Sequence, residues 1–440
     1  MSLTQQSKTL YGPAIVAAAF AAGILITLGL KDLYPDLETR FQRKVSSSAR
    51  SIRRQSSAYF AVRLEDRDHD DDDDDAHMRG IDACIGDTPL IEIRSLSQAT
   101  GRVMLAKAEF LNGAGGSPKD RVALSIIQDA ESKGLLVPGR GDTIYEGSVG
   151  STGISLATLA RARGYRAHIC MPDDQGVEKS DLLLHLGATV ERVAVAPISS
   201  PDHFVNLARR RARDHARLAA DGSRGFFADQ FESDANWRAH FESTGPEIWA
   251  QTDGGRLDAF VAGAGTGGTI SGVARYLKLD AGLARLRVVL ADPQGSGLYN
   301  SIRHGVMYSP TEREGSRRRQ QVDSLVEGIG INRITRNLEA GRHLIDDAVR
   351  ISDDQACRMA RWLVEHDGIF VGSSSAVNCA AAVSVAMSLP PGSRVITVLC
   401  DSGSRHMTKF WSRIKDMGLE QDHVTTDLFA ELGMQRESQV

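Results

Sequence analysis

Cysteine is scarce in this sequence, and its few residues show no pattern of pairing. The chain has five cysteines among 440 residues, most of them in apolar runs: Cys84, Cys170, Cys357, Cys379 and Cys400. None belongs to a Cys-x-x-Cys pair, and no His/Cys cluster has the spacing of metal ligands. The sequence therefore disfavours a disulfide framework, and we expect reduced thiols in a reducing compartment and no metal site.

A surplus of positive charge is missing as well. The sequence holds 52 Lys and Arg residues against 56 Asp and Glu residues, a formal net charge of -4, which points away from polyanionic partners such as nucleic acids. Four arginines do gather between residues 209 and 213, but aspartates lie nearby and no ladder of aromatic residues accompanies them. We therefore interpret this segment as a solvated surface helix.

Residues 11–30 contain no charged residue, whereas charged residues are frequent after them. About 20 apolar residues suffice for a helix to cross a bilayer, so this stretch predicts a transmembrane anchor. Few positive charges precede it and several follow it, so the rest of the chain is expected to face the cytosol. A cleaved secretory signal carries its charge on the other side of the apolar core, and a buried core helix would need a partner face. The alanine-rich span with its basic trailing flank resembles the signal anchors of mitochondrial outer-membrane proteins.

The segment 31–78 is polar and dense in charge, and it contains the aspartate run Asp70–Asp75 near its end. Such a run repels itself and buries nothing, so we expect a disordered linker between the anchor and a folded region. At the other end of the chain, residues 421–440 are expected to form a peripheral tail.

Between residues 79 and 420, short apolar runs alternate with amphipathic stretches, which is typical of strands alternating with helices. Strands are expected at 103–107, 143–145, 167–171, 189–195, 259–262, 288–291 and 395–399. Helices are expected at 151–163, 181–186, 204–220, 267–277 and 353–365. This alternation predicts an α/β fold with parallel sheets that are covered on both faces.

A glycine-rich loop follows one of these expected strands directly. Residues 263–272 read GAGTGGTISG, after the apolar run 259–262. Glycines allow close approach of the backbone, and the start of the following helix favours an anion, so the loop predicts a phosphate site. Far upstream, Lys119 follows Gly-Gly-Ser-Pro at the start of an amphipathic stretch. A phosphate site together with a fixed amine points to pyridoxal phosphate held as a Schiff base.

Seven pieces of the sequence, taken in order, resemble the cysteine synthase and cystathionine β-synthase family of fold-type II pyridoxal-phosphate enzymes, including its fungal membrane-anchored members. They are IGDTPL (85–90), the Lys119 segment, EGSVGSTG (146–153), DQF (229–231), the 263–272 loop, EGIG (327–330) and DSG (401–403). The resemblance implies two parallel-sheet α/β subdomains within residues 79–420, the smaller at about 111–232. It also implies a homodimer, with pyridoxal 5'-phosphate in the cleft between the subdomains.

The resemblance assigns the cofactor contacts to separate places in the chain. Lys119 would form the Schiff base and move the Cα proton of the substrate, because burial beside a cationic imine depresses the pKa of a lysine. The cofactor phosphate would be bound by Gly265, Thr266, Gly267, Gly268 and Thr269. Ser402 would face the pyridine nitrogen, where a neutral hydroxyl makes the ring a weaker electron sink. Its neighbour Asp401 is expected to point the opposite way, in a structural role.

The segment 146–153 corresponds to the family loop that binds the substrate α-carboxylate through hydroxyls and backbone amides. Substrate contacts are expected from Ser148, Val149, Gly150, Thr152 and, in another segment, Gln230. Ser151 stands where the family has an asparagine that contacts the ring hydroxyl of the cofactor. Val149 stands where the family usually has serine, and Gly147 replaces a proline. These departures leave the choice of β-substituent open.

The reaction that the resemblance implies is a β-replacement, in which an activated serine such as O-acetylserine reacts with sulfide to form L-cysteine. One alternative is an L-cysteine desulfhydrase, which converts cysteine to pyruvate, ammonia and sulfide. A second alternative is a catalytically silent scaffold at a membrane. The intact lysine and glycine loop favour an enzyme over the scaffold.

Overall fold

The computed structural model describes residues 80–218, 221–307, 324–420 and 426–435. The expected anchor at 11–30 and linker at 31–78 lie outside these ranges. Within the described residues, no helix combines the length and the apolar character that crossing a bilayer requires.

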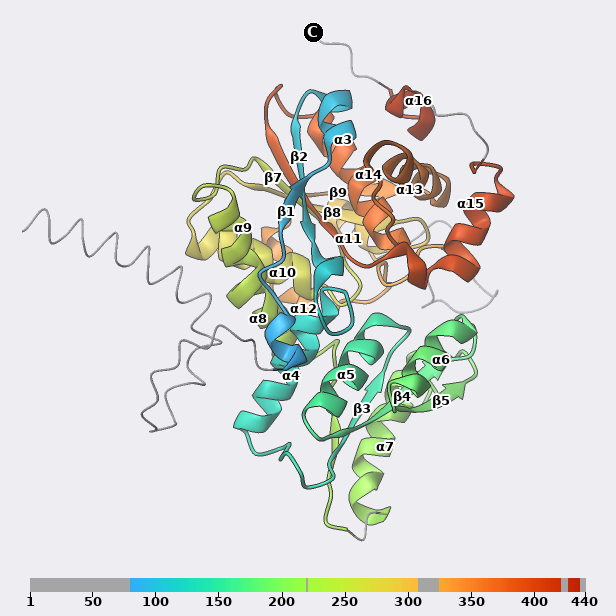
Figure 1. Ribbon diagram of the computed structural model, residues 1–440. Coiled ribbons are helices and arrows are strands. Elements are labelled where there is room, and N and C mark those ends of the chain that lie inside the picture. Colours follow the sequence, from blue (N-terminus) through green and yellow to red (C-terminus); the bar gives the residue numbers. More distant parts are fainter. Residues whose placement is uncertain (1–79, 219–220, 308–323, 421–425, 436–440) are drawn as a thin grey trace, which may run out of the picture. The chain divides into compact units, whose positions relative to one another are not determined.

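Two sheets organise the described part of the chain (Figure 1). The larger sheet has six strands in the order β1-β2-β10-β7-β8-β9 and forms the core of the larger lobe. Its strands are parallel except for β1, which pairs with β2 in antiparallel register. Their bounds are β1 (Leu90–Glu92), β2 (Val103–Ala108), β7 (Ala259–Gly263), β8 (Arg287–Pro293), β9 (Asp347–Ile351) and β10 (Arg394–Leu399).

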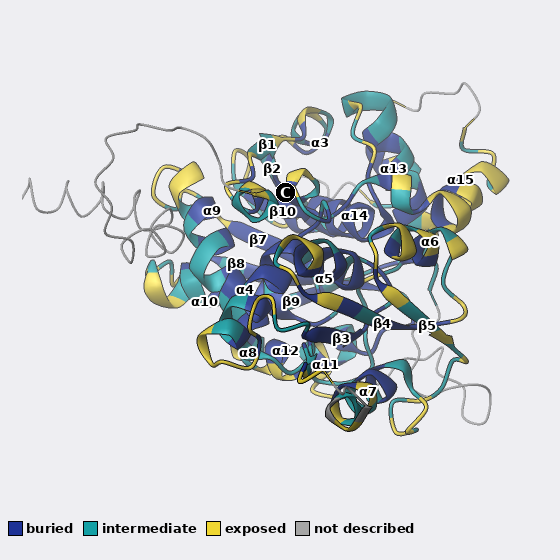
Figure 2. Cartoon of the chain, turned by 60° about the horizontal axis from the view of Figure 1, so that its bottom comes forward, coloured by how far each residue is buried: buried dark blue, intermediate teal, exposed yellow. Residues whose placement is uncertain are grey.

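Helices cover both faces of the larger sheet, because successive side chains of a strand point to opposite faces. Ala259 and Val261 of β7 pack with the helices of one face, α3 (Arg94–Thr100), α13 (Asp353–Asp367), α14 (Ser373–Met387), α15 (Ser412–Asp416) and α16 (Leu428–Leu432). Phe260 and Ala262 pack on the other face with α9 (Gly245–Gln251), α10 (Gly268–Arg275), α11 (Leu298–His304) and α12 (Arg336–Glu339). Figure 2 shows this sheet as a buried layer between partly exposed helices.

The smaller lobe is built on a parallel sheet of four strands in the order β5-β4-β3-β6. The strands are β3 (Thr143–Gly147), β4 (Arg166–Pro172), β5 (Thr189–Val193) and β6 (Gly225–Phe227). On one face lie α4 (Lys119–Ser132), α5 (Ser151–Ala162) and α6 (Val177–His185), and α8 (Asp234–Ala239) contributes Ala235 to the same core. The arginine-rich α7 (Phe204–Leu218) packs on the opposite face through Leu207 and Ala208.

The end of the chain differs from the expected peripheral tail. Three apolar side chains of α16, those of Leu428, Phe429 and Leu432, are buried in the core of the larger lobe. Asp427 caps this helix by accepting hydrogen bonds from the backbone N–H groups of Phe429 and Ala430. The helix is short, so its apolar positions gave no periodic signal in the sequence.

Candidate functional site

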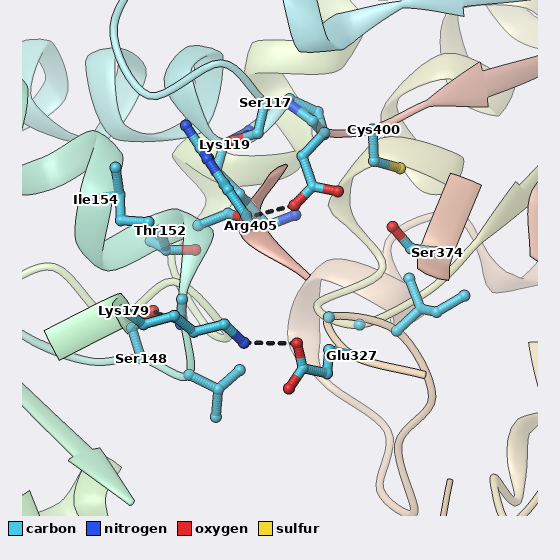
Figure 3. Close-up of a pocket in the computed structure, with 18 of the residues that line it drawn as sticks. Ser117, Lys119, Ser148, Thr152, Ile154, Lys179, Glu327, Ser374, Cys400 and Arg405 are labelled. Atoms are coloured by element: carbon cyan, nitrogen blue, oxygen red, sulfur yellow. Dashed lines mark hydrogen bonds and ion pairs between the residues drawn. The ribbon is translucent and has the colours of Figure 1, made fainter. Parts of the chain in front are cut away.

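A cavity of about 220 Å³ lies where the carboxyl ends of strands from both sheets approach one another (Figure 3). Its walls include the turn after β3, the loop after β7, the residues after β10 and the start of α4. The carboxyl ends of parallel strands are the usual location of ligand sites in α/β folds, because the connecting loops gather there. The cavity is therefore the candidate active site.

Lys119 lines this cavity as the first residue of α4. Among the described residues, none hydrogen-bonds or ion-pairs with its side-chain amine. Burial lowers the pKa of Lys119, and the nearby Cys400 and Asp401 oppose this shift. Removal from water disfavours the charged form of an amine, so the neutral, nucleophilic form is promoted.

The glycine loop reaches the same cavity through Gly265 and Thr266. A Cβ atom at position 265 would lie 2.2 Å from the carbonyl oxygen of Gly328, so only glycine lets the loop pack this closely against residue 328. The backbone N–H groups of Gly265, Thr266 and Gly267 have no acceptor among the described residues. The loop therefore brings unpaired backbone donors to the cavity.

The next residues of the loop begin α10 and are held by neighbouring side chains. Gly267 precedes the helix with a φ of 81°, in the left-handed region. A Cβ atom on Gly268 would lie 1.9 Å from Oδ1 of Asn236, whose Nδ2 donates to Oγ1 of Thr266 at 2.9 Å. The Thr269 hydroxyl lies 3.1 Å from Nε2 of His240. None of the residues 267–269 lines the cavity, so their expected contact with the cofactor phosphate stays a prediction.

The expected substrate residues line the cavity together with Ser151, which was expected to contact the cofactor ring. Around the start of α5 these residues are Ser148, Val149, Gly150, Ser151 and Thr152, and Gln230 joins them from another segment. The Ser148 hydroxyl accepts hydrogen bonds from the N–H groups of Gly150 (3.2 Å) and Gly153 (3.0 Å), which fixes the turn. Thr152 donates to Oε1 of Gln230 at 2.6 Å. The backbone N–H groups of residues 149, 151 and 152 have no acceptor among the described residues.

Asp401 and Ser402, which follow β10, have exchanged the positions that were expected for them. Asp401 lines the cavity, and Ser402 is absent from its walls. The alternation of an extended strand does not continue here, because β10 ends at Leu399 and the chain turns into a short helix at Gly403. The Ser402 hydroxyl accepts from the N–H of Ser404 at that helix start. Ser374 and Ser404 of the larger lobe do line the cavity, and Ser374 lies beside Cys400 (Figure 3).

Several residues that line the cavity were not predicted as site residues. They are Ser117, Lys179, Glu327, Ser374, Arg405 and His406. Ser117 belongs to the segment that precedes Lys119, and Glu327 belongs to the EGIG piece, but the sequence assigns neither a role. The others carry no local sequence signal, because each reaches the cavity from a segment that lies far from Lys119 in the chain.

Side chains of metal-ligand type also meet away from the cavity. Within the described residues, ligand atoms of His168, Cys170 and Glu191 lie within 4.8 Å of one another. Arg211 already pairs with Glu191, with Nη2 2.7 Å from Oε1. The guanidinium occupies the carboxylate and would repel a cation, so we propose no metal site at this cluster.

Comparisons with known proteins agree with this geometry. A family described as "Pyridoxal-phosphate dependent enzyme" matches residues 81–401. A Neurospora crassa protein named cysteine synthase 2 is 67% identical, and the alignment covers 99% of each chain. An Emericella nidulans protein of the same name is 59% identical over 92% of this chain and 94% of the relative. The crystal structure of an O-ureido-L-serine synthase is 32% identical with a TM-score of 0.66, covering 80% of this chain and 99% of that chain.

Proposed function

Because the chain belongs to the family of pyridoxal-phosphate dependent enzymes, we propose that it forms L-cysteine from O-acetylserine, or a similarly activated serine, and sulfide. The names of its fungal relatives support this reaction. The observation that carries the proposal is that Lys119, Gly265 and Thr266 line one cavity, where the lysine amine and the two loop N–H groups have no partner among the described residues.

The donor set of the cavity fits pyridoxal phosphate. The N–H groups at residues 265–267 would hold the phosphate, since none of them has an acceptor within the part of the chain that the structure describes. The Lys119 amine would hold the aldehyde carbon. We propose that Ser374, rather than Ser402, faces the ring nitrogen, because its hydroxyl lies in the cavity wall. When bound, the cofactor supplies an electron sink for the substrate's Cα.

The start of α5 is suited to an amino-acid carboxylate. Three backbone N–H groups without acceptors lie there, at residues 149, 151 and 152, and the positive end of the helix dipole adds to their effect. The Ser148 hydroxyl accepts from two N–H groups of the turn, which leaves its own proton free to donate. Recognition by this loop therefore uses the Ser148 hydroxyl and backbone amides.

Lys119 would also move the proton during the reaction. Its pKa is lowered by burial, so the neutral amine takes a proton from Cα at a lower cost than an ordinary lysine would. The acetate group leaves Cβ and sulfide takes its place. The second lysine of the cavity, Lys179, is less suited to this role because its Nζ is paired with Glu327 at 2.6 Å.

An assay with purified, cofactor-loaded protein tests the proposal. O-acetylserine and sulfide should give L-cysteine at a rate that is proportional to enzyme, and cysteine alone should release sulfide much more slowly. Faster sulfide release from cysteine than cysteine formation would reject the synthase in favour of a desulfhydrase.

The desulfhydrase stays the second candidate because of the residues at the carboxylate loop. Val149 supplies no hydroxyl donor, and the Ser151 hydroxyl lies 3.4 Å from Oδ2 of Asp401. A loop with fewer side-chain donors holds the substrate less firmly. It therefore discriminates less between replacement and elimination of the group at Cβ. Pyruvate measured in the same assay separates the two reactions.

We further propose that residues 11–30 anchor the enzyme in a membrane, the mitochondrial outer membrane, with the catalytic part facing the cytosol as a homodimer. The uncharged span and its basic trailing flank support the anchor. Deletion of residues 1–30 should move the protein from the carbonate-washed membrane pellet to the supernatant without loss of cysteine formation. A full-length chain that already fractionates with the supernatant would contradict the anchor.

A further inference from the structure

A chain of charged side chains connects the two lobes at the wall of the cavity. Lys179 of α6, in the smaller lobe, lies with Nζ 2.6 Å from Oε2 of Glu327 in the larger lobe, and Figure 3 shows the two side chains facing each other. Nδ1 of His406 lies 3.4 Å from the same Glu327 oxygen. Nε2 of His406 lies 3.1 Å from Oδ2 of Asp401.

This series of charged side chains ends at the loop that is proposed to bind the substrate carboxylate. Oδ2 of Asp401 accepts from the Ser151 hydroxyl, at 3.4 Å, and Ser151 is the first residue of α5 in the smaller lobe. His406 thus stands at the centre of a connection with one end on α6 and the other on α5. All five residues line the cavity.

His406 and Asp401 are buried and closely fitted. Their side chains are 5% and 8% exposed, and that of Glu327 is 11% exposed. A Cβ atom on Gly372 would lie 2.4 Å from both Nε2 of His406 and Oδ1 of Asp401, so the pair packs against bare backbone at the start of α14. Oδ1 of Asp401 and Nδ1 of His406 have no hydrogen-bond partner among the described residues, so Nδ1 meets Glu327 as an ion pair only.

The two carboxylates beside His406 favour a positively charged imidazole between them. Without a charge on the imidazole, the carboxylates of Asp401 and Glu327 would flank a neutral group in a poorly solvated place. Burial alone would lower the pKa of His406, but the two carboxylates outweigh it and raise the pKa to about 9. The charged groups that face this region are Asp401, Glu327, Lys179, Lys409 and Arg405.

We propose that His406 is a positioning residue for the amino-acid substrate: as a cation it joins Asp401 to Glu327, and through them it holds Ser151 and Lys179 of the smaller lobe against the larger lobe. This inference rests on the proposed function, because Ser151 belongs to the segment proposed to bind the α-carboxylate. Loss of the cation loosens the carboxylate loop and leaves Lys119 in place. Substrate binding therefore suffers more than the chemical step.

The first test compares the wild type with His406→Gln, using the full cofactor-loaded chain. At pH 7 the variant should raise KM for O-acetylserine about tenfold, the effect of losing a hydrogen bond to a charged group, while kcat changes less than about threefold. The wild-type KM should rise as the pH passes about 9, where His406 loses its proton. The KM of the variant should show no such step. His366→Gln, on α13 and stacked on Trp362, is the control and should match the wild type.

A second measurement does not depend on turnover. In the cofactor-free chain at pH 7, the amides of residues 177–185 should exchange with deuterium faster in His406→Gln than in the wild type, and the difference should vanish above about pH 9. Glu327→Gln should have the same effect, and the double variant should add little, because both substitutions break one connection. A lower kcat with unchanged KM and unchanged exchange would overturn the proposal. Faster exchange in a chain that forms no cysteine would support the connection and reject the proposed reaction.

Discussion

Lys119→Ala is expected to lower kcat/KM for cysteine formation by on the order of 10³-fold or more, because the substitution removes both the cofactor attachment and the proton-transfer group. The protein should still fold, since Lys119 makes no side-chain hydrogen bond with a described residue and stands at the first position of α4. Borohydride reduction followed by intact-protein mass measurement should find the cofactor on the wild type and none on the variant.

The control for this experiment is Lys133→Ala. Lys133 lies just after the end of the same helix, and its side chain is 55% exposed and pairs with Asp129 on the surface. Exposed pairs of this kind contribute little, so the variant should keep wild-type activity and wild-type cofactor content. If Lys119→Ala retained covalently bound cofactor, the attachment would lie on another lysine, and Lys179 in the cavity wall would be the first to examine.

The alternation of strands and helices could be predicted from the sequence, because apolar runs and amphipathic stretches follow different periods. Helix α14 was missed for a physical reason. Its side chains from Ser373 to Val383 are buried, so it has no polar face to create a helical period. Strand β9 was missed as well. Its sequence, DAVRI, mixes charged and apolar residues in a short edge strand.

Some residues of the site belong to local sequence motifs, whereas others are brought together only by the fold. Lys119, Gly265 and Thr266 could be predicted because each belongs to a contiguous piece with its own chemistry. Ser402 was assigned to the cofactor by family resemblance, and Asp401 was directed away from the cavity by extending strand alternation past the end of β10, where the alternation no longer holds. The connection through His406 joins four separate segments, and no local pattern records which distant side chains a fold will bring together.

Arg121→Met is expected to destabilise the protein by about 3–5 kcal/mol, the cost of leaving the buried carboxylate of Glu109 without its ion-pair partner, whereas Glu247 keeps Lys107. The Arg121 guanidinium lies between two buried carboxylates, with Nε 2.8 Å from Oε2 of Glu109 and Nη1 2.6 Å from Oε1 of Glu247. Its side chain is 2% exposed. Glu247 comes from α9 of the larger lobe, and Arg121 is two positions after Lys119 on α4. The network therefore fixes the helix that carries the proposed catalytic lysine.

The pH dependence of this effect follows from Glu109. Burial alone would raise the pKa of Glu109, but Arg121 outweighs it and lowers the pKa to about 2. A depressed pKa contributes stability that is complete above the ordinary range of a glutamate, near pH 4.5, and that is lost as the pH falls toward 2. In urea unfolding experiments the difference in the free energy of unfolding between the wild type and Arg121→Met should be largest at pH 7. It should decrease below pH 4.5. Arg166→Met, which removes a 66% exposed partner of Asp221, should cost less than about 1 kcal/mol. If Arg121→Met and Arg166→Met unfolded at the same urea concentration at pH 7, the buried network would not hold α4 in place.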